Sequence, residues 1–325
     1  MQLDSIDQKL LNRLQVNFPL VSQPYALIGW DLGISEDETV RRIERLKTGG
    51  IIRQIGPLFD AKKLNYKTTL VAMRATGLEL DKAVQLLADY PVSHAYERDH
   101  YFNLWFTLAL PAAMDADIEL KKMFSPVKYE ACFSLPAIKV FKLRVFFDSG
   151  ADEHTEIAEP TGVASSQPET GLSDADRKVI NEIQQDLLLI SRPFAAMAEK
   201  TGMSEEQFLE QSQSLLERGV MRRFSVSVNH RQVGFMANAM TCWAVPKEKV
   251  DLAGQKLASL KEVSHCYERS TNPLWKYNIF AMIHGQTRED CRKIADKVSA
   301  ELGLNDGIML FSTREFKKTR LKYPV

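Results

Sequence analysis

Two six-residue segments carry the side chains of this sequence that are best suited to proton transfer and anion binding. They read SHAYER at residues 93–98 and SHCYER at residues 264–269. Side chains alternate along a β-strand, so the histidine, tyrosine and arginine of each segment lie on one face. Histidine titrates near neutral pH, tyrosine forms hydrogen bonds, and arginine binds carboxylates. A packing face would carry Val, Ile or Leu, so we expect each face to line a binding site.

A second interpretation of these faces remains open. A strand face of His, Tyr and Arg is also compatible with a solvated or inter-subunit surface. Glu97 and Glu268 stand next to the arginines and could form salt bridges with them there.

The two segments belong to two copies of one longer unit. The stretch that begins at Leu3 aligns with the stretch that begins at Leu172, at an offset of 169. SHAYER matches SHCYER at an offset of 171, and Asn103 matches Asn278 at an offset of 175. The second copy therefore has four extra residues after Arg269. Matches that keep the same order along the chain indicate a tandem duplication.

Each copy divides into two predicted domains, and a segment of different composition separates the copies. Residues 149–171 contain few large apolar side chains and are rich in Glu, Pro, Ser and Thr, which predicts a flexible linker. The linker is long enough for the copies to pack as a pseudo-symmetric pair within one chain. The predicted domains are winged helix-turn-helix domains at residues 1–66 and 172–235 and ferredoxin-like domains at residues 67–148 and 236–325.

The first domain of each copy has the pattern of a helix-turn-helix followed by a β-wing. Ser35 and Glu38 form a capping box that begins a helix over residues 36–47. The second copy repeats this pattern with Ser204 and Gln207. The stretches IIRQIGPLFD and VMRRFSVSVN follow, and we expect each of them to form a short wing.

The second domain of each copy reads as strand, helix, strand, strand, helix, strand. This order is the ferredoxin-like βαββαβ pattern, so the predicted fold class is α+β. In the first copy we expect strands at residues 68–75, 92–99, 102–110 and 130–144, and helices at 80–90 and 113–124. In the second copy we expect strands at residues 238–245, 263–269, 277–284 and 308–317, and helices at 249–260 and 288–302.

The composition argues against several classes of protein. The chain has 42 basic and 42 acidic residues, and a zero net charge argues against a general nucleic-acid coat. No apolar run reaches the roughly 18 residues that a membrane span needs, and the N-terminus lacks the pattern of a signal peptide. The four cysteines form no CxxC pair. We therefore expect neither a disulfide framework nor a zinc site, and we expect the chain to work in the cytoplasm.

Longer motifs resemble a known family. A winged helix-turn-helix followed by a ferredoxin-like domain is the layout of the leucine-responsive regulators (Lrp/AsnC), whose recognition helix resembles SEDETVRRIERLKTGGIIR. The segments IGPLFDAKKLNY, SHAYERDHYFNLWFT and SHCYERSTNPLWKYNIFAMIHG are similar to the siroheme decarboxylases. Those are two-subunit enzymes on the regulator fold, and some are fused into one chain. The resemblance covers nearly the whole chain apart from the linker.

The resemblance implies a reaction and a set of partners. Such enzymes remove CO2 from the acetate side chains at C12 and C18 of siroheme. The product, 12,18-didecarboxysiroheme, feeds heme d1 synthesis or the alternative route to heme b. No separate cofactor is implied, because the iron belongs to the substrate. The expected ligands are siroheme and other iron tetrapyrroles, and contacts with other heme d1 enzymes or a further homodimer stay open.

The resemblance also suggests roles for the two strand faces. His94 and His265 are the candidate catalytic residues, as proton donors or as ligands of the substrate iron. Which copy carries the chemistry is open. The expected substrate-binding residues on the same faces are Tyr96 and Tyr267, which would form hydrogen bonds, and Arg98 and Arg269, which would bind carboxylates.

Six further residues are weaker candidates for substrate binding. They are Arg53, Arg222 and Arg223 in the wings, Trp275 and Lys276 in the insertion of the second copy, and His100 in the equivalent turn of the first. The wing arginines could instead interact with a helix C-terminus. In the insertion, the tryptophan would stack on the macrocycle and the lysine would bind a carboxylate. Alternatively, the insertion is a hairpin tip with one aromatic anchor.

Two alternative functions compete with decarboxylation. A transcription regulator needs two equivalent readers for a symmetric operator. The arginines of the first predicted recognition helix are replaced in the second copy, where Arg41, Arg42 and Arg45 become Glu210, Gln211 and Ser214. We therefore do not expect DNA binding, and both helix-turn-helices are interpreted as scaffold. The second alternative is a non-catalytic tetrapyrrole carrier, which only the family resemblance disfavours.

Overall fold

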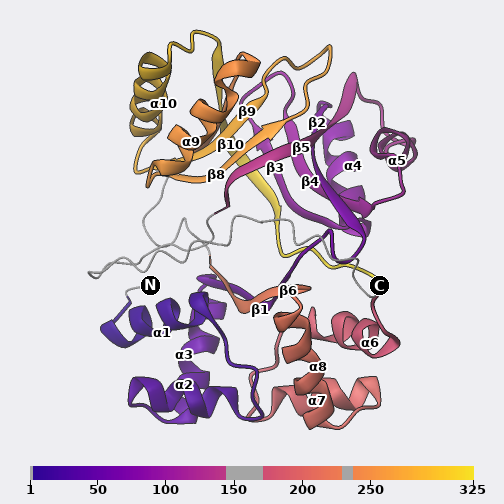
Figure 1. The fold of residues 1–325 in the computed structure, drawn as a ribbon, viewed down its shortest axis with the longest axis vertical. Helices are drawn as coiled ribbons and strands as arrows, with labels where there is room; N and C mark the ends of the chain where they lie inside the picture. Colours follow the sequence, from indigo (N-terminus) through magenta and orange to yellow (C-terminus); the bar gives the residue numbers. More distant parts are fainter. Residues whose placement is uncertain (1–2, 144–170, 229–236) are drawn as a thin grey trace. The chain divides into compact units, whose positions relative to one another are not determined.

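The fold was analysed in a computed structural model, which describes residues 3–143, 171–228 and 237–325. These residues fall into two units, and each unit combines parts of both copies (Figure 1). The winged-helix unit contains residues 3–65, 171–228 and 322–325, and the barrel unit contains residues 66–143 and 237–321. The predicted linker lies outside the described residues except for its last residue. Within the described part of the chain, no helix is long and apolar enough to cross a bilayer.

Three helices from each copy build the winged-helix unit. They are α1 (Ser5–Val16), α2 (Pro24–Leu32) and α3 (Glu36–Thr48) from the first copy and α6 (Asp174–Ile183), α7 (Pro193–Thr201) and α8 (Glu205–Glu217) from the second. The predicted capping box is complete at Ser204 and Gln207. At α3 only half of it forms, because both carboxylate oxygens of Glu38 pair with the arginines at positions 41 and 42.

The two predicted wings form one shared ribbon. Strand β1 (Ile52–Phe59) of the first copy pairs antiparallel with strand β6 (Met221–Val228) of the second. The prediction of a separate wing in each copy was therefore wrong. Each copy supplies one strand to this sheet, and the main-chain groups of that strand find their partners on the other copy.

The last four residues belong to the winged-helix unit. The amide of Gln184 accepts a hydrogen bond of 2.8 Å from the main-chain nitrogen of Tyr323 and donates one of 3.0 Å to its carbonyl. The sequence had assigned residues 236–325 to the second ferredoxin-like domain. The structure instead ends that domain at residue 321, because this side-chain amide satisfies both main-chain groups of the tail.

The barrel unit contains both predicted ferredoxin-like domains, and the α+β fold class is confirmed. Eight strands close into a barrel in the order β10-β3-β4-β2-β5-β8-β9-β7. The strands are β2 (Tyr66–Arg74), β3 (Val92–Arg98), β4 (Leu104–Pro111), β5 (Ala131–Leu143), β7 (Ala237–Trp243), β8 (Val263–Arg269), β9 (Ile279–Gly285) and β10 (Gly307–Lys318). The helices are α4 (Leu78–Leu86), α5 (Ala116–Met123), α9 (Val250–Ser259) and α10 (Arg288–Leu302), with short 3₁₀ turns at η1 (Leu87–Asp89) and η3 (Lys247–Lys249).

The long last strand of each copy closes the barrel by crossing to the other copy. Strand β5 pairs with β2 of its own copy and with β8 of the second, and β10 pairs with β7 and with β3 of the first. The ring of Phe141 on β5 packs so closely on Gly254 of α9 that a Cβ there would lie 2.4 Å from it. A glycine at this position lets the crossing strand approach the helix.

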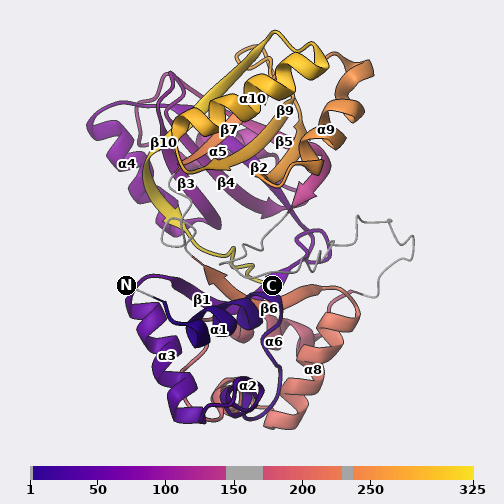
Figure 2. The same ribbon diagram turned by 90° about the vertical axis from the view of Figure 1, so that its left-hand side faces the viewer.

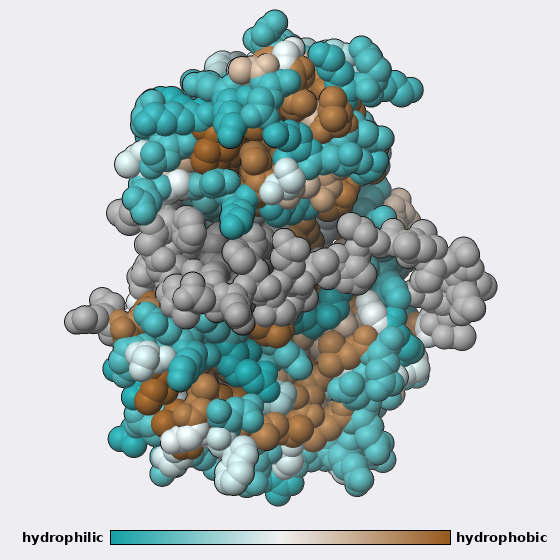
Figure 3. Space-filling view, turned by 60° about the vertical axis from the view of Figure 1, so that its left-hand side comes forward, coloured by the Kyte–Doolittle hydropathy of each residue, from teal (hydrophilic) through white to brown (hydrophobic). Residues whose placement is uncertain are grey.

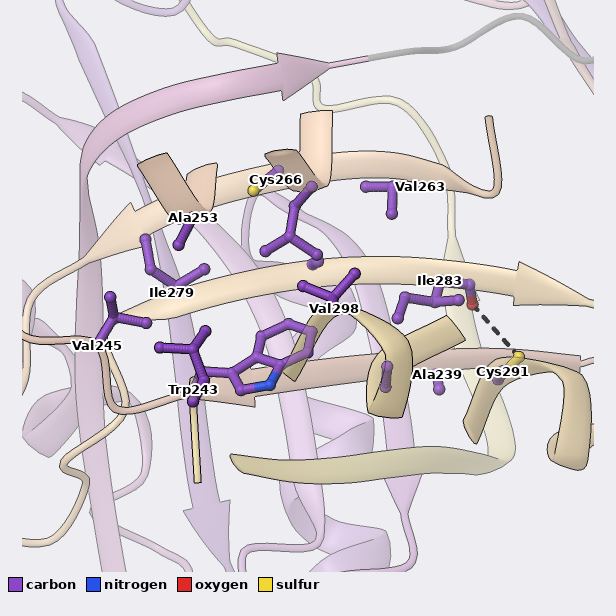
Figure 4. Packing of buried hydrophobic residues seen from close by; sticks show 14 of the residues in the cluster. Ala239, Trp243, Val245, Ala253, Val263, Cys266, Ile279, Ile283, Cys291 and Val298 are labelled. Carbon is purple, nitrogen blue, oxygen red and sulfur yellow. Dashed lines mark hydrogen bonds between the residues drawn. The ribbon is translucent and has the colours of Figure 1, made fainter. Parts of the chain in front are cut away.

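The helices cover the outer face of the barrel (Figures 1 and 2). Trp243, Ile279 and Val298 belong to the apolar core between α9, α10 and the strands of the second copy (Figure 4). A matching core lies between α4, α5 and the strands of the first copy. Because these two cores use the outward-facing side chains, the inner face of the barrel is left for a third cluster and for polar residues.

Candidate functional site

The histidine and tyrosine of each SH-x-YER segment lie on the inner face of the barrel. Ala95 is fully buried in the outer core of the first copy, so His94 and Tyr96 on either side of it face inward. Cys266 is likewise buried in the outer core of the second copy, between His265 and Tyr267. His94 is exposed, and the other three inward-facing side chains are partly exposed. This end of the inner face, named here the histidine end, is therefore accessible.

The charge of His94 affects the pKa of His265, although the two histidines come from different copies. Burial, followed by the charges of His94, His284 and Lys318, lowers the pKa of His265 to about 3. Lys318 of β10 is the cross-strand neighbour of His94, whereas Leu143 of β5 is the cross-strand neighbour of His265. The histidine end thus has a polar wall beside His94 and an apolar wall beside His265.

Two arginines lie deeper in the barrel, Arg98 buried and Arg269 partly exposed. Arg98 donates from Nη1 to the carbonyl of Leu310 at 3.0 Å, and Arg269 donates in the same way to Leu135 at 2.9 Å. Burial lowers the pKa of both, and that of Arg98 falls to about 10, so Arg98 remains cationic at neutral pH. Within the described part of the chain, Nε of each has no hydrogen-bond partner. A carboxylate would satisfy such a buried donor.

Aromatic side chains fill the other end of the barrel, named here the tryptophan end. Trp275 is 3% exposed, and its ring lies 4.9 Å from that of Trp105 and 5.1 Å from that of Tyr277. It belongs to the inner apolar cluster with Phe102 and Phe280. The structure thus places Trp275 as an aromatic anchor, which was the alternative interpretation of the insertion.

His100 and Lys276 also lie at the tryptophan end. Nδ1 of His100 accepts a hydrogen bond of 3.1 Å from the main chain of Phe102, and burial lowers the pKa of this histidine. Lys276 forms a 2.6 Å ion pair with Asp306. An open groove of about 380 Å³ runs between His100, Leu274 and Lys276.

The predicted site residues are therefore split between two ends of one barrel. Strand β3 rises about 3.3 Å per residue, so roughly 13 Å separate His94 from Arg98, and His100 follows beyond the strand. The sequence predicts that His100, Trp275 and Lys276 bind the same substrate as the histidines. The structure does not bring them together, because a turn that follows a strand lies far from the start of that strand.

The wing arginines lie in the other unit. Arg53 is on β1, and Arg222 and Arg223 are on β6. Arg222 donates to the carboxylate of Asp60 at 2.8 Å, which joins the two wing strands. These three arginines are positioned by the shared ribbon and not by the barrel that carries the histidines.

Sequence reasoning missed several residues of the histidine end. Lys318 falls one residue beyond the predicted last strand, and Glu315 is the cross-strand neighbour of Tyr96. His284 was noted only as a difference between the copies, since Ala109 stands at its place in the first copy. A comparison of inward-facing positions between the copies would have revealed all three. In the described part of the chain, no three His, Cys, Asp or Glu side chains gather as a metal site.

Two family models match the chain, each of them twice. An AsnC-like ligand binding domain matches residues 63–142 and 232–317. A siroheme decarboxylase NirDL-like HTH domain matches residues 7–53 and 176–222. The paired matches coincide with the two copies of the repeat.

Known proteins match both the whole chain and one half of it. A siroheme decarboxylase of Hydrogenobacter thermophilus is 37% identical over 317 residues, which are 97% of this chain and 94% of that protein. A siroheme decarboxylase beta subunit of Methanosarcina barkeri is 39% identical over 151 residues, which are 46% of this chain and 99% of that subunit. One chain thus has the length of two such subunits.

A solved structure matches the fold over almost the whole chain. It is the crystal structure of the siroheme decarboxylase NirDL in co-complex with an iron-uroporphyrin III analogue. The TM-score is 0.72 and the sequence identity 34%, with 99% of this chain and 95% of that chain covered. These similarities in sequence, domain order and fold agree, and the chain belongs to the siroheme decarboxylase family.

Proposed function

We propose that the chain removes CO2 from the C12 and C18 acetates of siroheme and yields 12,18-didecarboxysiroheme, for heme d1 synthesis or the alternative route to heme b. The observation that carries the proposal is the position of His94 and His265, one from each copy, on the accessible inner face of one barrel whose depth holds Arg98 and Arg269. Relatives that cover the whole chain are siroheme decarboxylases. A related enzyme binds an iron tetrapyrrole analogue.

The charges of the barrel interior suit a polyanionic tetrapyrrole. Arg98 and Arg269 lie below the histidines, and Lys318 lies beside them. We assign these cations to the carboxylates that the reaction keeps, since fixed cations in a water-poor site bind carboxylates strongly. The apolar wall with Val140 and Leu143 suits the flat macrocycle, and Val140 is 53% exposed although it faces inward.

The reaction needs the carboxylate to leave and a proton to replace it. The C–C bond to the carboxylate breaks, CO2 departs, and the electron pair stays on the side-chain carbon, where the conjugated ring delocalises it. His94 or His265 then donates a proton to this carbon. Binding of the remaining carboxylates at a distance offsets the cost of desolvating the reacting one. The iron is part of the substrate, and no separate cofactor enters these steps.

Two acetates must react in one barrel. Either the tetrapyrrole rebinds in another orientation between the two steps, or each copy serves one acetate. The different walls beside His94 and His265 mean that the two copies offer unequal environments to the two acetates.

The arrangement of α3 argues against the transcription-regulator alternative. Arg42 is only 15% exposed and is paired with Asp4, Asp7 and Glu38. It therefore faces its own domain, and phosphate contacts would have to replace these ion pairs. In space-filling view, apolar residues reach the surface of the winged-helix unit among polar ones (Figure 3). Trp30 of α2 is 84% exposed.

The proposal is tested by anaerobic incubation of the full chain with siroheme, followed by mass spectrometry of the tetrapyrrole. We expect loss of two CO2 units, and His94→Ala and His265→Ala identify the contribution of each copy. Siroheme that stays bound with its mass unchanged would establish the carrier alternative. Sequence-specific, salt-sensitive binding to duplex DNA together with unchanged siroheme would establish the regulator alternative.

A further inference from the structure

A chain of three hydrogen-bonded side chains stands behind the histidine of the second copy. Ser264 Oγ lies 2.7 Å from Nδ1 of His265 and 2.6 Å from Nε2 of His284. Ser264 is 4% exposed and His284 is 9% exposed, so both contacts are shielded from bulk water. The three residues come from two adjacent strands, β8 and β9.

The first copy has only half of this arrangement. Ser93 Oγ lies 2.8 Å from Nδ1 of His94, which reproduces the serine–histidine contact. At the position equivalent to His284, however, β4 carries Ala109, which is fully buried and has no group to transfer a proton. Of the two copies, the second therefore has all three hydrogen-bonded side chains and the first has two.

The single hydroxyl proton of Ser264 gives the three hydrogen-bonded side chains a direction. A serine hydroxyl has one proton, so Ser264 donates to one imidazole and accepts from an N–H of the other. The protons are ordered either from His284 towards His265 or in the opposite direction. Passing one proton through the chain switches it from one order to the other, as a proton relay requires.

We propose that His284 and Ser264 relay to His265 the proton that replaces CO2 on the substrate, an inference that rests on the proposed decarboxylation. His284 as imidazolium donates from Nε2 to Ser264 Oγ, and the hydroxyl passes its own proton to Nδ1 of His265. His265 donates from Nε2 to the carbon that holds the electron pair left by CO2. Both imidazoles end neutral, with the proton of His265 on Nδ1. One proton from solvent that enters at Nε2 of His265, while a proton passes back through Ser264 to His284, restores the starting state for each CO2 released.

The charged groups around the relay determine when His284 is protonated. Lys318 on β10, Arg269 on β8 and His94 on β3 all face His265 and are basic. Burial, followed by the charge of Lys318, lowers the pKa of His284 to about 4. The carboxylates of a bound tetrapyrrole oppose these charges and raise that pKa. The relay therefore takes up its proton when substrate is bound.

The experiment compares four variants of the full chain with siroheme under anaerobic conditions. Ser264→Ala interrupts the row of hydrogen-bonded side chains, and His284→Ala introduces the residue of the first copy. His284→Gln keeps a hydrogen-bonding side chain that cannot carry a proton. Ser93→Ala is the matched control, since it removes the equivalent serine where no second histidine follows. The readouts are kcat, KM and the pH dependence of kcat.

We expect Ser264→Ala, His284→Ala and His284→Gln to lower kcat by about 10–100-fold with KM unchanged, whereas Ser93→Ala keeps the pH dependence of wild-type kcat. An acid must be protonated to donate, so wild-type kcat falls as the pH rises through the pKa of bound His284. This decrease of kcat with rising pH disappears in both His284 variants. Should His284→Gln restore wild-type kcat and pH dependence, His284 only positions Ser264 and the relay is wrong.

The failure of the relay and the failure of the proposed function give different results. Active wild type with unaltered His284 and Ser264 variants overturns the relay alone. Wild type that releases no CO2 overturns the decarboxylation and the relay together. If His284→Ala does not fold, as judged by circular dichroism, His284→Gln and Ser264→Ala still decide between relay and positioning.

Discussion

Arg98 of the first copy donates a 3.0 Å hydrogen bond to the main-chain carbonyl of Leu310, which belongs to the second copy. Arg269 and Leu135 repeat the contact with the copies exchanged, at 2.9 Å. Each copy therefore holds the deep arginine of the other in place. The barrel interior depends on both copies, which gives a structural reason for two halves in one chain.

Arg98→Ala should lower the free energy of unfolding of the barrel unit by about 2–4 kcal/mol. Arg98 is 5% exposed, and loss of its side chain leaves a buried carbonyl without this donor and a void beside Tyr96. Siroheme affinity should fall at the same time, because a carboxylate partner is removed. Urea denaturation and titration of siroheme absorbance measure the two effects.

Arg314→Ala is the matched control for Arg98→Ala. Its side chain is 55% exposed and forms ion pairs of 3.5 Å and 3.4 Å with Asp81 and Glu97 on the outer face. We expect a change below about 1 kcal/mol, as for other exposed pairs, and unaltered siroheme affinity. Equal effects of both substitutions would contradict an interior role of Arg98.

Much of this architecture could be predicted from the sequence because it depends on local patterns. The repeat, the βαββαβ order and the inward alternation of His94, Tyr96 and Arg98 follow from periodicity alone. Helix α3 ends one residue beyond its predicted end, and β8 matches its predicted range. These features need no knowledge of contacts between distant parts of the chain.

Trp275→Ala should destabilise the protein without altering the absorbance of bound siroheme. Trp275 is buried at the tryptophan end against Trp105, and removing a buried indole costs about 3–5 kcal/mol. Lys276→Ala, at the next position and exposed, should leave the urea midpoint unchanged. A Trp275 variant of normal stability with shifted siroheme absorbance would instead support stacking on the macrocycle.

Acid should destabilise the folded chain through His265 and His284. Below pH 6.5 the unfolded chain protonates both imidazoles, while the folded chain keeps them neutral down to about pH 3 and pH 4, respectively. The unfolded state then binds more protons, so the free energy of unfolding falls as the pH is lowered. His284→Gln should reduce the fall between pH 7 and pH 4.5 by about 2 kcal/mol.

Urea denaturation at several pH values measures this effect. The buried position of His284 and the charge of Lys318 cause its low pKa, so the benefit of His284→Gln should be confined to acid pH. At pH 7 the variant should be no more stable than wild type. A pH dependence identical to that of wild type would show that His284 titrates normally in the folded state.

The parts of the site that the sequence did not predict arise from long-range pairing. Barrel closure depends on β5 and β10 crossing between copies, and no local pattern specifies which strand edge each will find. Lys318 reaches the histidine end only through its register with His94 on β3. The sequence leaves open whether Trp275 stacks on the macrocycle or anchors a hairpin tip, because its burial depends on Trp105 and Phe102 of the opposite copy.

Arg42→Ala tests the interpretation of the helix-turn-helix as scaffold. Asp7 is fully buried, and it is paired with Arg42 at 2.8 Å and with Arg45 at 2.5 Å. Loss of Arg42 leaves this carboxylate with one cation, and we expect a decrease of about 1–3 kcal/mol in the free energy of unfolding of the winged-helix unit.

Arg41→Ala is the control, because its side chain is 71% exposed, forms an ion pair with Glu38 and donates to the main-chain carbonyl of Asp37. It should change stability by less than about 0.5 kcal/mol. Both variants should leave duplex DNA binding as weak as in wild type at any salt concentration, measured by fluorescence anisotropy. A regulator would give the opposite pattern: Arg41→Ala, with its accessible guanidinium, would weaken DNA binding and flatten its salt dependence, since a phosphate contact releases counterions.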